Sequence, residues 1–276
     1  MNRSMIHAAN TMSQLQQRLD LISHNVANVN TVGYKKREAT FSEMLYQQFD
    51  NQFDERFENN RLTPMGIRQG VGAKIGATKL LLTQGAIQQT ERPLDVAFSK
   101  AGMFFQVLVE QNGQQAVKYT RSGNFQLTPV GQNDVMLVSD NGYPILDANG
   151  NSIVFSREAT DITITASGEI VAQSANGIPQ TFELGLVQVN RPQLLVASGG
   201  NLFELPPNQN AEEIVNELIG VRRQEAGIQQ GALEQSNVDL SKEMSEMMLT
   251  QRAYQFNSRS ISMSDQMMGL VNSIRS

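Results

Sequence analysis

The chain of 276 residues is long enough for one large domain or two ordinary ones. Its formal net charge is −5, from 22 basic and 27 acidic side chains, which makes a nucleic-acid backbone or an anionic lipid surface a poor partner. No cysteine is present, so disulfides and thiolate metal sites are excluded.

The N-terminal segment predicts an amphipathic helix that ends before Gly33. Asn25, Asn28 and Asn30 compete for backbone hydrogen bonds, and glycine readily takes the left-handed conformation found just past a helix end. The apolar residues recur in alternating steps of three and four, which puts them on one seam: Met5, Ala8, Met12, Leu15, Leu19, Ile22 and Val26. The first twenty residues lack the continuous apolar stretch of a secretory signal, so we expect any export to use a route without a cleaved signal.

Residues 36–90 predict an extended connector, because a polar run is followed by a glycine-punctuated one. The spacing of Gly70, Gly72 and Gly76 does not match a dinucleotide-binding loop, since the third glycine falls one position late. An acidic and aromatic tract within the connector could bind a cation or a partner, but its aromatic spacing of four favours one packed helical face: Phe49, Asp50, Phe53, Asp54, Glu55, Phe57 and Glu58.

Between Leu94 and Leu205 the apolar pattern changes to a period of two. Short runs such as FFQVLV, DITITA and LGLVQV are separated by turn signals such as DNG and DANGN. This pattern predicts an antiparallel β domain, which we assign to residues 91–225. We expect one or two helical turns at 211–220 and a return connector at 226–235.

One segment of the β domain has the spacing of a calcium loop. Position 6 of that loop is Ser152 where glycine is expected, and Gly150 lies between alternating β runs. A hairpin turn therefore explains the same residues without an ion, and we favour the turn. The four residues at ligand positions are Asp147, Asn149, Asn151 and Glu158.

The C-terminal segment from residue 236 predicts a second helix, with Ser236 and Asp239 as suitable N-terminal caps. Six of the 13 methionines lie in it, and flexible thioethers suit a core shared between subunits. Two terminal helices of this kind are marginal alone, so we infer that they order fully on assembly. The seam of the C-terminal helix repeats the three-four alternation but includes four polar residues. It consists of Leu240, Met244, Met247, Gln251, Tyr254, Ser258, Ile261, Asp265 and Met268.

Catalytic signatures are missing from the sequence, which contains no G-x-S-x-G, H-E-x-x-H or P-loop motif. His7 and His24 lack the spacing of a metal site, and we interpret them as exposed helix residues. Two rival classes stay open: an enzyme that acts on peptidoglycan, which needs a carboxylate pair or a metal, and an adhesin-like β domain with incidental helical ends.

Both ends of the chain resemble the flagellar rod and hook family of bacterial axial proteins. The N-terminal stretch LDLISHNVANVNTVGYKK is similar to the family's first signature, and GALEQSNVDLSKEM with its continuation is similar to the second. The stretches FSEMLYQQ, PMGIRQGVGA and LTQGAIQQTERPLDVAF resemble the distal rod type. Residues that fit the signatures include Ala27, Asn28, Asn30, Thr31, Gly33, Tyr34, Lys35, Leu233, Glu234, Ser236, Asn237, Val238, Glu243, Met244, Arg252, Ala253, Tyr254, Asn257 and Asp265.

The resemblance implies an α+β fold in which the terminal helices, at 1–35 and 236–276, pair as a coiled-coil-like layer beside the β-rich domain. It implies a structural subunit of the distal rod, a helical tube that transmits torque and encloses the export channel. The partners would be copies of the chain, related rod or hook proteins and the flagellar type III export apparatus, in the basal body. A hook or proximal rod subunit is the alternative within the family.

No catalytic residue, metal, cofactor, small-molecule substrate, nucleic acid or membrane insertion is expected. Within this resemblance, Gly33 would permit a corner where the chain leaves the helical layer, and Asn28 and Asn30 would satisfy its backbone groups. The expected assembly interface consists of Met5, Met12, Leu15, Leu19, Ile22, Val26, Asn28, Asn30, Gly33, Tyr34, Leu240, Met244, Met247, Gln251, Tyr254, Asn257, Ile261 and Met268.

Overall fold

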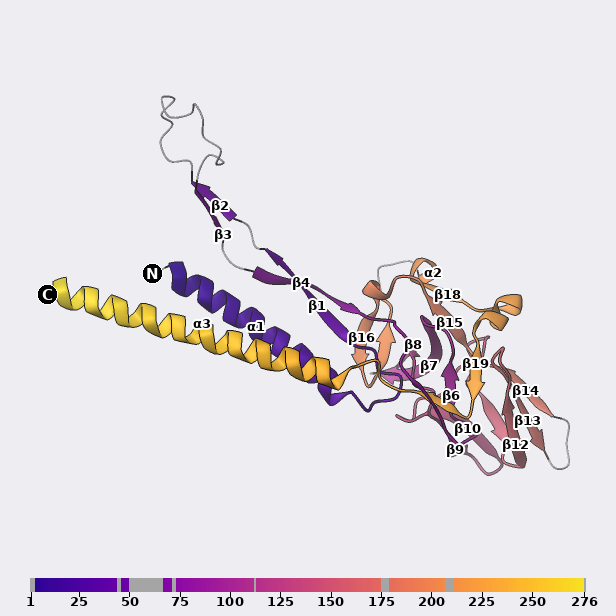
Figure 1. The fold of residues 1–276 in the computed structure, drawn as a ribbon. Helices are drawn as coiled ribbons and strands as arrows, with labels where there is room; N and C mark the ends of the chain where they lie inside the picture. The colour runs from indigo at the N-terminus through magenta and orange to yellow at the C-terminus, as the bar shows by residue number, and fades with distance from the viewer. Residues whose placement is uncertain are drawn as a thin grey trace. The chain divides into compact units, whose positions relative to one another are not determined.

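The computed structural model describes residues 3–43, 46–49, 67–70, 73–111, 113–174, 179–206 and 211–275. Helices lie at both ends of the chain and antiparallel strands lie between them, so the predicted α+β class is confirmed (Figure 1). The chain divides into two compact units. The terminal unit comprises Met1–His24, Glu38–Lys79 and Ser241–Ser276, and the β-rich unit comprises Asn25–Arg37 and Leu80–Leu240.

Helix α1 spans Arg3–Ala27, as the apolar period predicts. Ala8 and Ile22 of its seam are buried, and the other five seam residues are half-buried. The helix ends well before Gly33, which has a φ of +67°. The predicted position of the helix and of its end is therefore confirmed.

Helix α3 spans Leu240–Arg275 and begins directly after Asp239. Its least exposed face differs from the predicted stripe at every second position, because Glu243, Thr250 and Asn257 occupy the places expected for Met244, Gln251 and Ser258. The predicted stripe and the least exposed stripe share Met247, Tyr254 and Ile261. The apolar pattern predicts the first of these stripes, which is the more exposed one in the structure. The role of the predicted residues at an interface stays a prediction.

Among the described residues, four strands lie wholly or mostly in the terminal unit. Strands β1 (Arg37–Glu43) and β4 (Ala73–Leu80) form one two-stranded sheet, and β2 (Tyr46–Phe49) pairs antiparallel with β3 (Ile67–Gly70). Phe49 is paired with Ile67, so the prediction of a helical face is wrong for this residue. The rest of the aromatic tract, from Asp50 to Glu58, lies outside the described residues, as does Gly72.

The β-rich unit is built around a six-stranded antiparallel sheet with the order β16-β17-β8-β7-β15-β18. Phe104 and Phe105 of β7 alternate across it: Phe105 belongs to the larger core cluster and Phe104 to a smaller one with Val187 and Phe203. The strands are β7 (Met103–Gln111), β8 (Gln114–Thr120), β15 (Leu186–Val189), β16 (Val196–Gly199), β17 (Leu202–Glu204) and β18 (Val215–Glu217).

Two three-stranded sheets accompany the larger one, with the orders β11-β10-β9 and β12-β13-β14. All described pairings in the unit are antiparallel, which confirms the β prediction. The bounds are β9 (Phe125–Val130), β10 (Asp134–Ser139), β11 (Val154–Ser156), β12 (Ala159–Ile164), β13 (Glu169–Ser174) and β14 (Gln180–Glu183).

The segment predicted to hold one or two helical turns contains α2 (Ala211–Ile214), which is a single turn, and continues into strand β18. Two short 3-10 helices, η2 (Pro192–Leu194) and η3 (Gly220–Glu225), lie on either side of it in the sequence. The helical expectation is therefore right at the start of the segment and wrong after Ile214, where Val215 and Leu218 are buried at the sheet.

Two short ladders join distant parts of the chain. Strand β5 (Ile87–Gln89) pairs with β20 (Ala232–Glu234), and β6 (Val96–Phe98) pairs with β19 (Ile228–Gln230). The segment that enters the β-rich unit thus lies against the segment that leaves it. Among the described helices, none is long and apolar enough to cross a membrane.

Candidate assembly site

The corner after α1 is organised by Asn25, whose side chain is fully buried. Its Oδ1 accepts hydrogen bonds from the Tyr34 hydroxyl at 3.0 Å and from the Arg37 N–H at 3.1 Å, and its Nδ2 donates to the Arg37 carbonyl at 2.9 Å. One amide therefore satisfies both backbone groups of Arg37 and fixes Tyr34.

Asn28 and Asn30, the two asparagines expected to satisfy the backbone groups of this corner, lie in the segment just after α1. Asn28 Oδ1 accepts a hydrogen bond from the Thr31 hydroxyl at 3.1 Å, and Asn30 is exposed. Sequence reasoning missed Asn25 as a site residue. A signal existed, since Asn25 lies three residues after Ile22 and so faces the buried seam, where a polar side chain needs a partner.

Gly33 is required at the corner for two reasons. Its φ of +67° is a left-handed conformation, as predicted. A Cβ at this position would also lie 2.7 Å from the backbone of Arg121 and Ser122. Because the residue has no side chain, its N–H can approach the carbonyl of Glu234 and donate to it at 2.8 Å.

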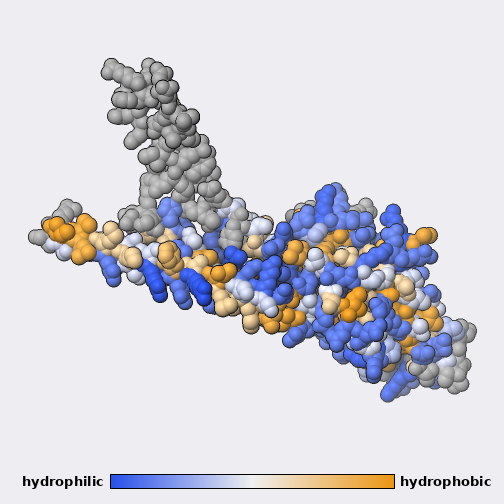
Figure 2. Space-filling model, viewed as in Figure 1, coloured by the Kyte–Doolittle hydropathy of each residue, from blue (hydrophilic) through white to orange (hydrophobic). Residues whose placement is uncertain are grey.

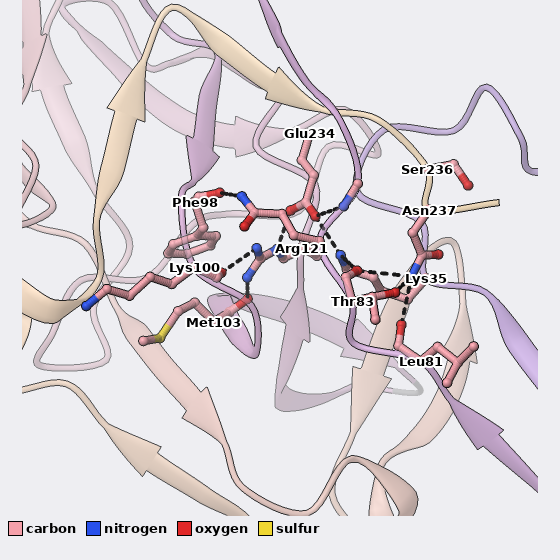
Figure 3. Close-up of polar contacts among 12 residues, drawn as sticks. Lys35, Leu81, Thr83, Phe98, Lys100, Met103, Arg121, Glu234, Ser236 and Asn237 are labelled. Carbon is pink, nitrogen blue, oxygen red and sulfur yellow. Dashed lines mark hydrogen bonds and ion pairs between the residues drawn. The ribbon is translucent and has the colours of Figure 1, made fainter. Parts of the chain in front are cut away.

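Three charged side chains from distant segments meet beside this corner, and we name Lys35, Arg121 and Glu234 the ionic cluster (Figure 3). Lys35 Nζ lies 2.6 Å from Glu234 Oε1, and Arg121 Nε lies 2.6 Å from Glu234 Oε2. All three side chains are at most 2% exposed. The two residues of the terminal signatures, Lys35 and Glu234, thus meet directly, and Arg121 is a third member that the sequence did not reveal.

Every charge in the ionic cluster has further hydrogen bonds. Arg121 donates to the carbonyls of Met103 and Lys100, and its guanidinium carbon lies 4.7 Å from the centre of the Phe98 ring. Lys35 Nζ donates to the Thr83 carbonyl at 2.9 Å. The Gly85 N–H donates to Glu234 Oε1 at 2.9 Å. Such saturation is what allows three charges to be buried together.

Burial and mutual attraction act in opposite directions on the titration of the ionic cluster. For the Glu234 carboxyl, burial would raise the pKa, but Arg121, Lys35 and the Gly85 N–H outweigh it and hold the pKa below its ordinary value. For the Lys35 ammonium and the Arg121 guanidinium, burial lowers the pKa more than Glu234 raises it. The carboxylate is therefore ionised at neutral pH.

Asn237 ties the C-terminal signature to the same place. Its Oδ1 accepts a hydrogen bond from the Lys36 N–H at 2.7 Å, and its Nδ2 donates to the carbonyls of Leu81 at 2.9 Å and Thr83 at 3.0 Å. Asn237 lies three residues before Leu240, the first residue of α3. The last turn of α1, from Asn25, and the first residue of α3, Leu240, both belong to the β-rich unit.

Among the described residues, exposed large apolar side chains are most numerous along α3. Figure 2 shows an orange patch at the C-terminal end of this helix. The polar residues Glu243 and Thr250 are buried instead. We name the exposed set the α3 apolar face: Leu240, Met244, Met248, Leu249, Phe256, Met263, Met267, Met268, Leu270, Val271 and Ile274.

The two terminal helices contact one another within this unit. Arg18 of α1 and Glu246 of α3 form an ion pair at 3.5 Å, and both side chains are about one-third exposed, at 36% and 32%. Of the predicted interface residues, Leu240, Met244 and Met268 belong to the α3 apolar face, whereas Met247, Tyr254, Asn257 and Ile261 are half-buried.

The calcium-like segment forms a turn, as favoured. Asp147 Oδ1 accepts hydrogen bonds from the N–H groups of Asn149 at 2.8 Å and Asn151 at 2.7 Å, and Gly150 has a φ of +82°. These bonds are those of an aspartate that closes its own turn. In the described part of the chain, no group of three or more metal-ligating His, Asp or Glu side chains occurs.

Three family descriptions match successive parts of the chain: flagella basal body rod protein at residues 5–35, flagellar hook protein FlgE/F/G D1 domain at 101–172, and flagellar basal body rod FlgEFG protein C-terminal at 229–274. The chain is 47% identical over 280 residues to the flagellar hook-basal body complex protein FlhP of Bacillus subtilis, and the match covers 100% of both chains.

Further similarity is found to flagellar basal-body rod proteins FlgG. The chain is 35% identical over 281 residues to that of Borreliella burgdorferi, covering 100% of this chain and 99% of the relative. It is 33% identical over 273 residues to that of Caulobacter vibrioides, covering 98% of each. The two terminal matches contain Lys35 and Glu234, the residues that meet in the ionic cluster. The chain belongs to the flagellar basal-body rod and hook family.

Proposed function

We propose that this chain is a structural subunit of the distal rod of the flagellar basal body. Copies of it would form a helical tube that carries torque from motor to hook and encloses the export channel. Full-length similarity to relatives named flagellar basal-body rod protein and hook-basal body complex protein supports this role. The hook and the proximal rod are the other positions open to a member of this family.

The observation that carries the proposal is the α3 apolar face. Phe256 is 72% exposed and Ile274 is 86% exposed, on a helix of 36 residues whose buried positions include Glu243 and Thr250. Many exposed large apolar side chains on one helix are typical of an interaction site. Methionines adapt to partners that are not identical, so copies and related rod or hook proteins are both suitable occupants.

We further propose that the terminal helices act together in the assembled state as a coiled-coil-like layer. The ion pair between Arg18 and Glu246 and the half-buried α1 seam support this arrangement. The proposed domain layout is a helical assembly domain at 1–35 and 236–276, a connector at 36–90, a β-rich domain at 91–225 and a return connector at 226–235. The predicted interface residues are part of this proposal.

The proposal also covers the route and the chemistry. The chain would reach the basal body through the flagellar type III export apparatus without a cleaved signal, and it would act as a structural protein and not as an enzyme. The names of the relatives support location in the basal body and assembly with rod and hook proteins. Peptidoglycan hydrolysis by the purified chain would favour the rival enzymatic function instead.

Substitution of two exposed apolar residues of α3 by serine tests the proposal. The double variant Leu249→Ser and Phe256→Ser, produced in cells that lack the parent chain, should abolish motility and incorporation into purified basal bodies. Unfolding of the β-rich unit should not change. The matched control is Gln255→Ser, which alters an exposed polar neighbour on the same helix. Normal incorporation of the double variant would contradict the proposal.

A further inference from the structure

The two terminal signatures meet in one unit, and their contacts suggest more than packing. We propose that the ionic cluster, together with Asn25 and Asn237, is a shared mount for both terminal helices. It would fix the end of α1 relative to the start of α3, so that a disturbance on either side loosens the other. The role in assembly rests on the proposed function, but the coupling is a property of the single chain.

The first connection runs through backbone hydrogen bonds of the corner. Asn25, in the last turn of α1, binds both the N–H and the carbonyl of Arg37. The preceding residue, Lys36, donates its N–H to Asn237, which lies three residues before α3 begins. Only two amide side chains, the buried Asn25 and the half-buried Asn237, and one dipeptide therefore separate the end of one helix from the start of the other.

The second connection runs through Glu234 and uses both its backbone and its side chain. Its carbonyl accepts the Gly33 N–H at 2.8 Å, and its carboxylate accepts Lys35 Nζ at 2.6 Å. Both partners belong to the corner after α1. A movement of strand β20 would therefore break contacts to Gly33 and Lys35 together.

Arg121 gives the mount a fixed reference in the β-rich unit. Its guanidinium is held by the carbonyls of Met103 and Lys100, and strand β7, which begins at Met103, lies in the middle of the large sheet. A buried cation of this kind depends on its carboxylate, because removal of one partner leaves an uncompensated charge away from water. Loss of Glu234 would leave two such cations, so the connections should fail as a unit.

A further contact holds the corner from the β16–β17 turn. Asn201 is the one described residue other than glycine with a positive φ, at 60°, and its Nδ2 donates to the Val32 carbonyl at 3.0 Å. A left-handed conformation is unfavourable for any residue other than glycine, although asparagine tolerates it better than most. The surrounding structure therefore fixes Asn201 in this conformation, in which it contacts the corner.

Hydrogen exchange of the full-length chain tests the coupling in both directions. Glu234→Gln alters the C-terminal side, and the decisive reading is the amide exchange of residues 25–37. Lys35→Met alters the N-terminal side, and the decisive reading is the exchange of residues 228–238. Each variant should accelerate exchange in the distant segment at least about tenfold, since coupling between two sites is reciprocal.

The matched control is Glu213→Gln, which breaks an exposed ion pair with Arg191 and should leave both segments unchanged. If Glu234→Gln fails to fold, Asn237→Ala removes one side of the mount without stranding a charge, and the same reading at residues 25–37 applies. Faster exchange confined to the substituted side in these variants would overturn the proposal.

The outcome is separable from that of the proposed function. Hydrogen exchange on the purified chain reports the coupling even if the chain assembles into no rod. Conversely, if the exchange results are as expected but Leu249→Ser with Phe256→Ser still incorporates normally, the mount stands and the assembly role of the α3 apolar face fails.

Discussion

Phe105 and Phe256 have the same side chain in opposite situations. Phe105, in strand β7, is 0% exposed and lies between the rings of Phe98 and Phe125, with centroids at 4.3 Å and 5.0 Å. Phe256, in α3, is 72% exposed. Apolar side chains of the β-rich unit pack together in its core, whereas those of the α3 apolar face are exposed in the described chain.

This difference separates stability from assembly. Burial of a large aromatic side chain stabilises a fold by roughly 1.5–3 kcal/mol, and the β-rich unit obtains this contribution from its own core. Exposed apolar side chains contribute that free energy only when something covers them. We therefore expect substitutions in the core to change folding and substitutions on α3 to change assembly.

The sharpest way to break this comparison is to truncate both phenylalanines. Phe105→Ala should lower the free energy of unfolding of the β-rich unit by about 3–5 kcal/mol, because it creates a cavity in a packed core. Phe256→Ala should change it by less than about 0.5 kcal/mol. Thermal unfolding followed by calorimetry and circular dichroism measures both. Similar losses in the two variants would refute the separation.

The second test compares a buried ion pair with an exposed one. Arg121→Met leaves Glu234 with Lys35 alone and should cost about 3–5 kcal/mol of folding free energy. Glu213→Gln breaks the pair of Arg191 and Glu213, whose side chains are 54% and 60% exposed. That control should cost less than about 1 kcal/mol. Equal effects in denaturant unfolding would mean that the ionic cluster carries no special weight.

The third test concerns the corner. Gly33→Ala meets both an unfavourable φ of +67° and a clash with the Arg121 backbone. The control Gly142→Ala has a φ of +81° but no atom within 4 Å of the added Cβ, so it reports the backbone strain alone. We expect a loss of about 1–2 kcal/mol for the control and a larger loss for Gly33→Ala. A smaller loss at Gly33 would show that the corner can move away from Arg121.

The smallest expected effect is a dependence on pH. The folded pKa of Glu234 lies below its ordinary value, so between the two values the unfolded chain binds more protons than the folded chain. The contribution of this carboxylate to stability is complete above the unfolded pKa of about 4.3 and is lost as the pH falls through the folded pKa. Melting curves should show this loss, and Glu234→Gln should reduce it relative to Glu213→Gln. Parallel pH profiles for Glu234→Gln and the parent would contradict it.

Much of the fold could be predicted because periodicity is a local property. The three-four alternation from Met5 to Val26 predicts α1, and the change to a period of two after Leu94 predicts the antiparallel strands. Gly33 could be predicted at the corner because few residues adopt a left-handed conformation. The least exposed face of α3 could not, since two stripes overlap at Met247, Tyr254 and Ile261 and only packing distinguishes them.

The sequence by itself thus determined the two terminal helices, the antiparallel strands of the β-rich unit as a class, and the family signature at each end of the chain. Only the tertiary structure decided that Asn25 organises the corner and that Arg121 joins Lys35 to Glu234. The physical reason is range: backbone preference and amphipathic period act over a few residues, whereas Lys35 and Glu234 lie 199 residues apart. A buried charge is tolerated only when the fold places a partner of opposite charge beside it.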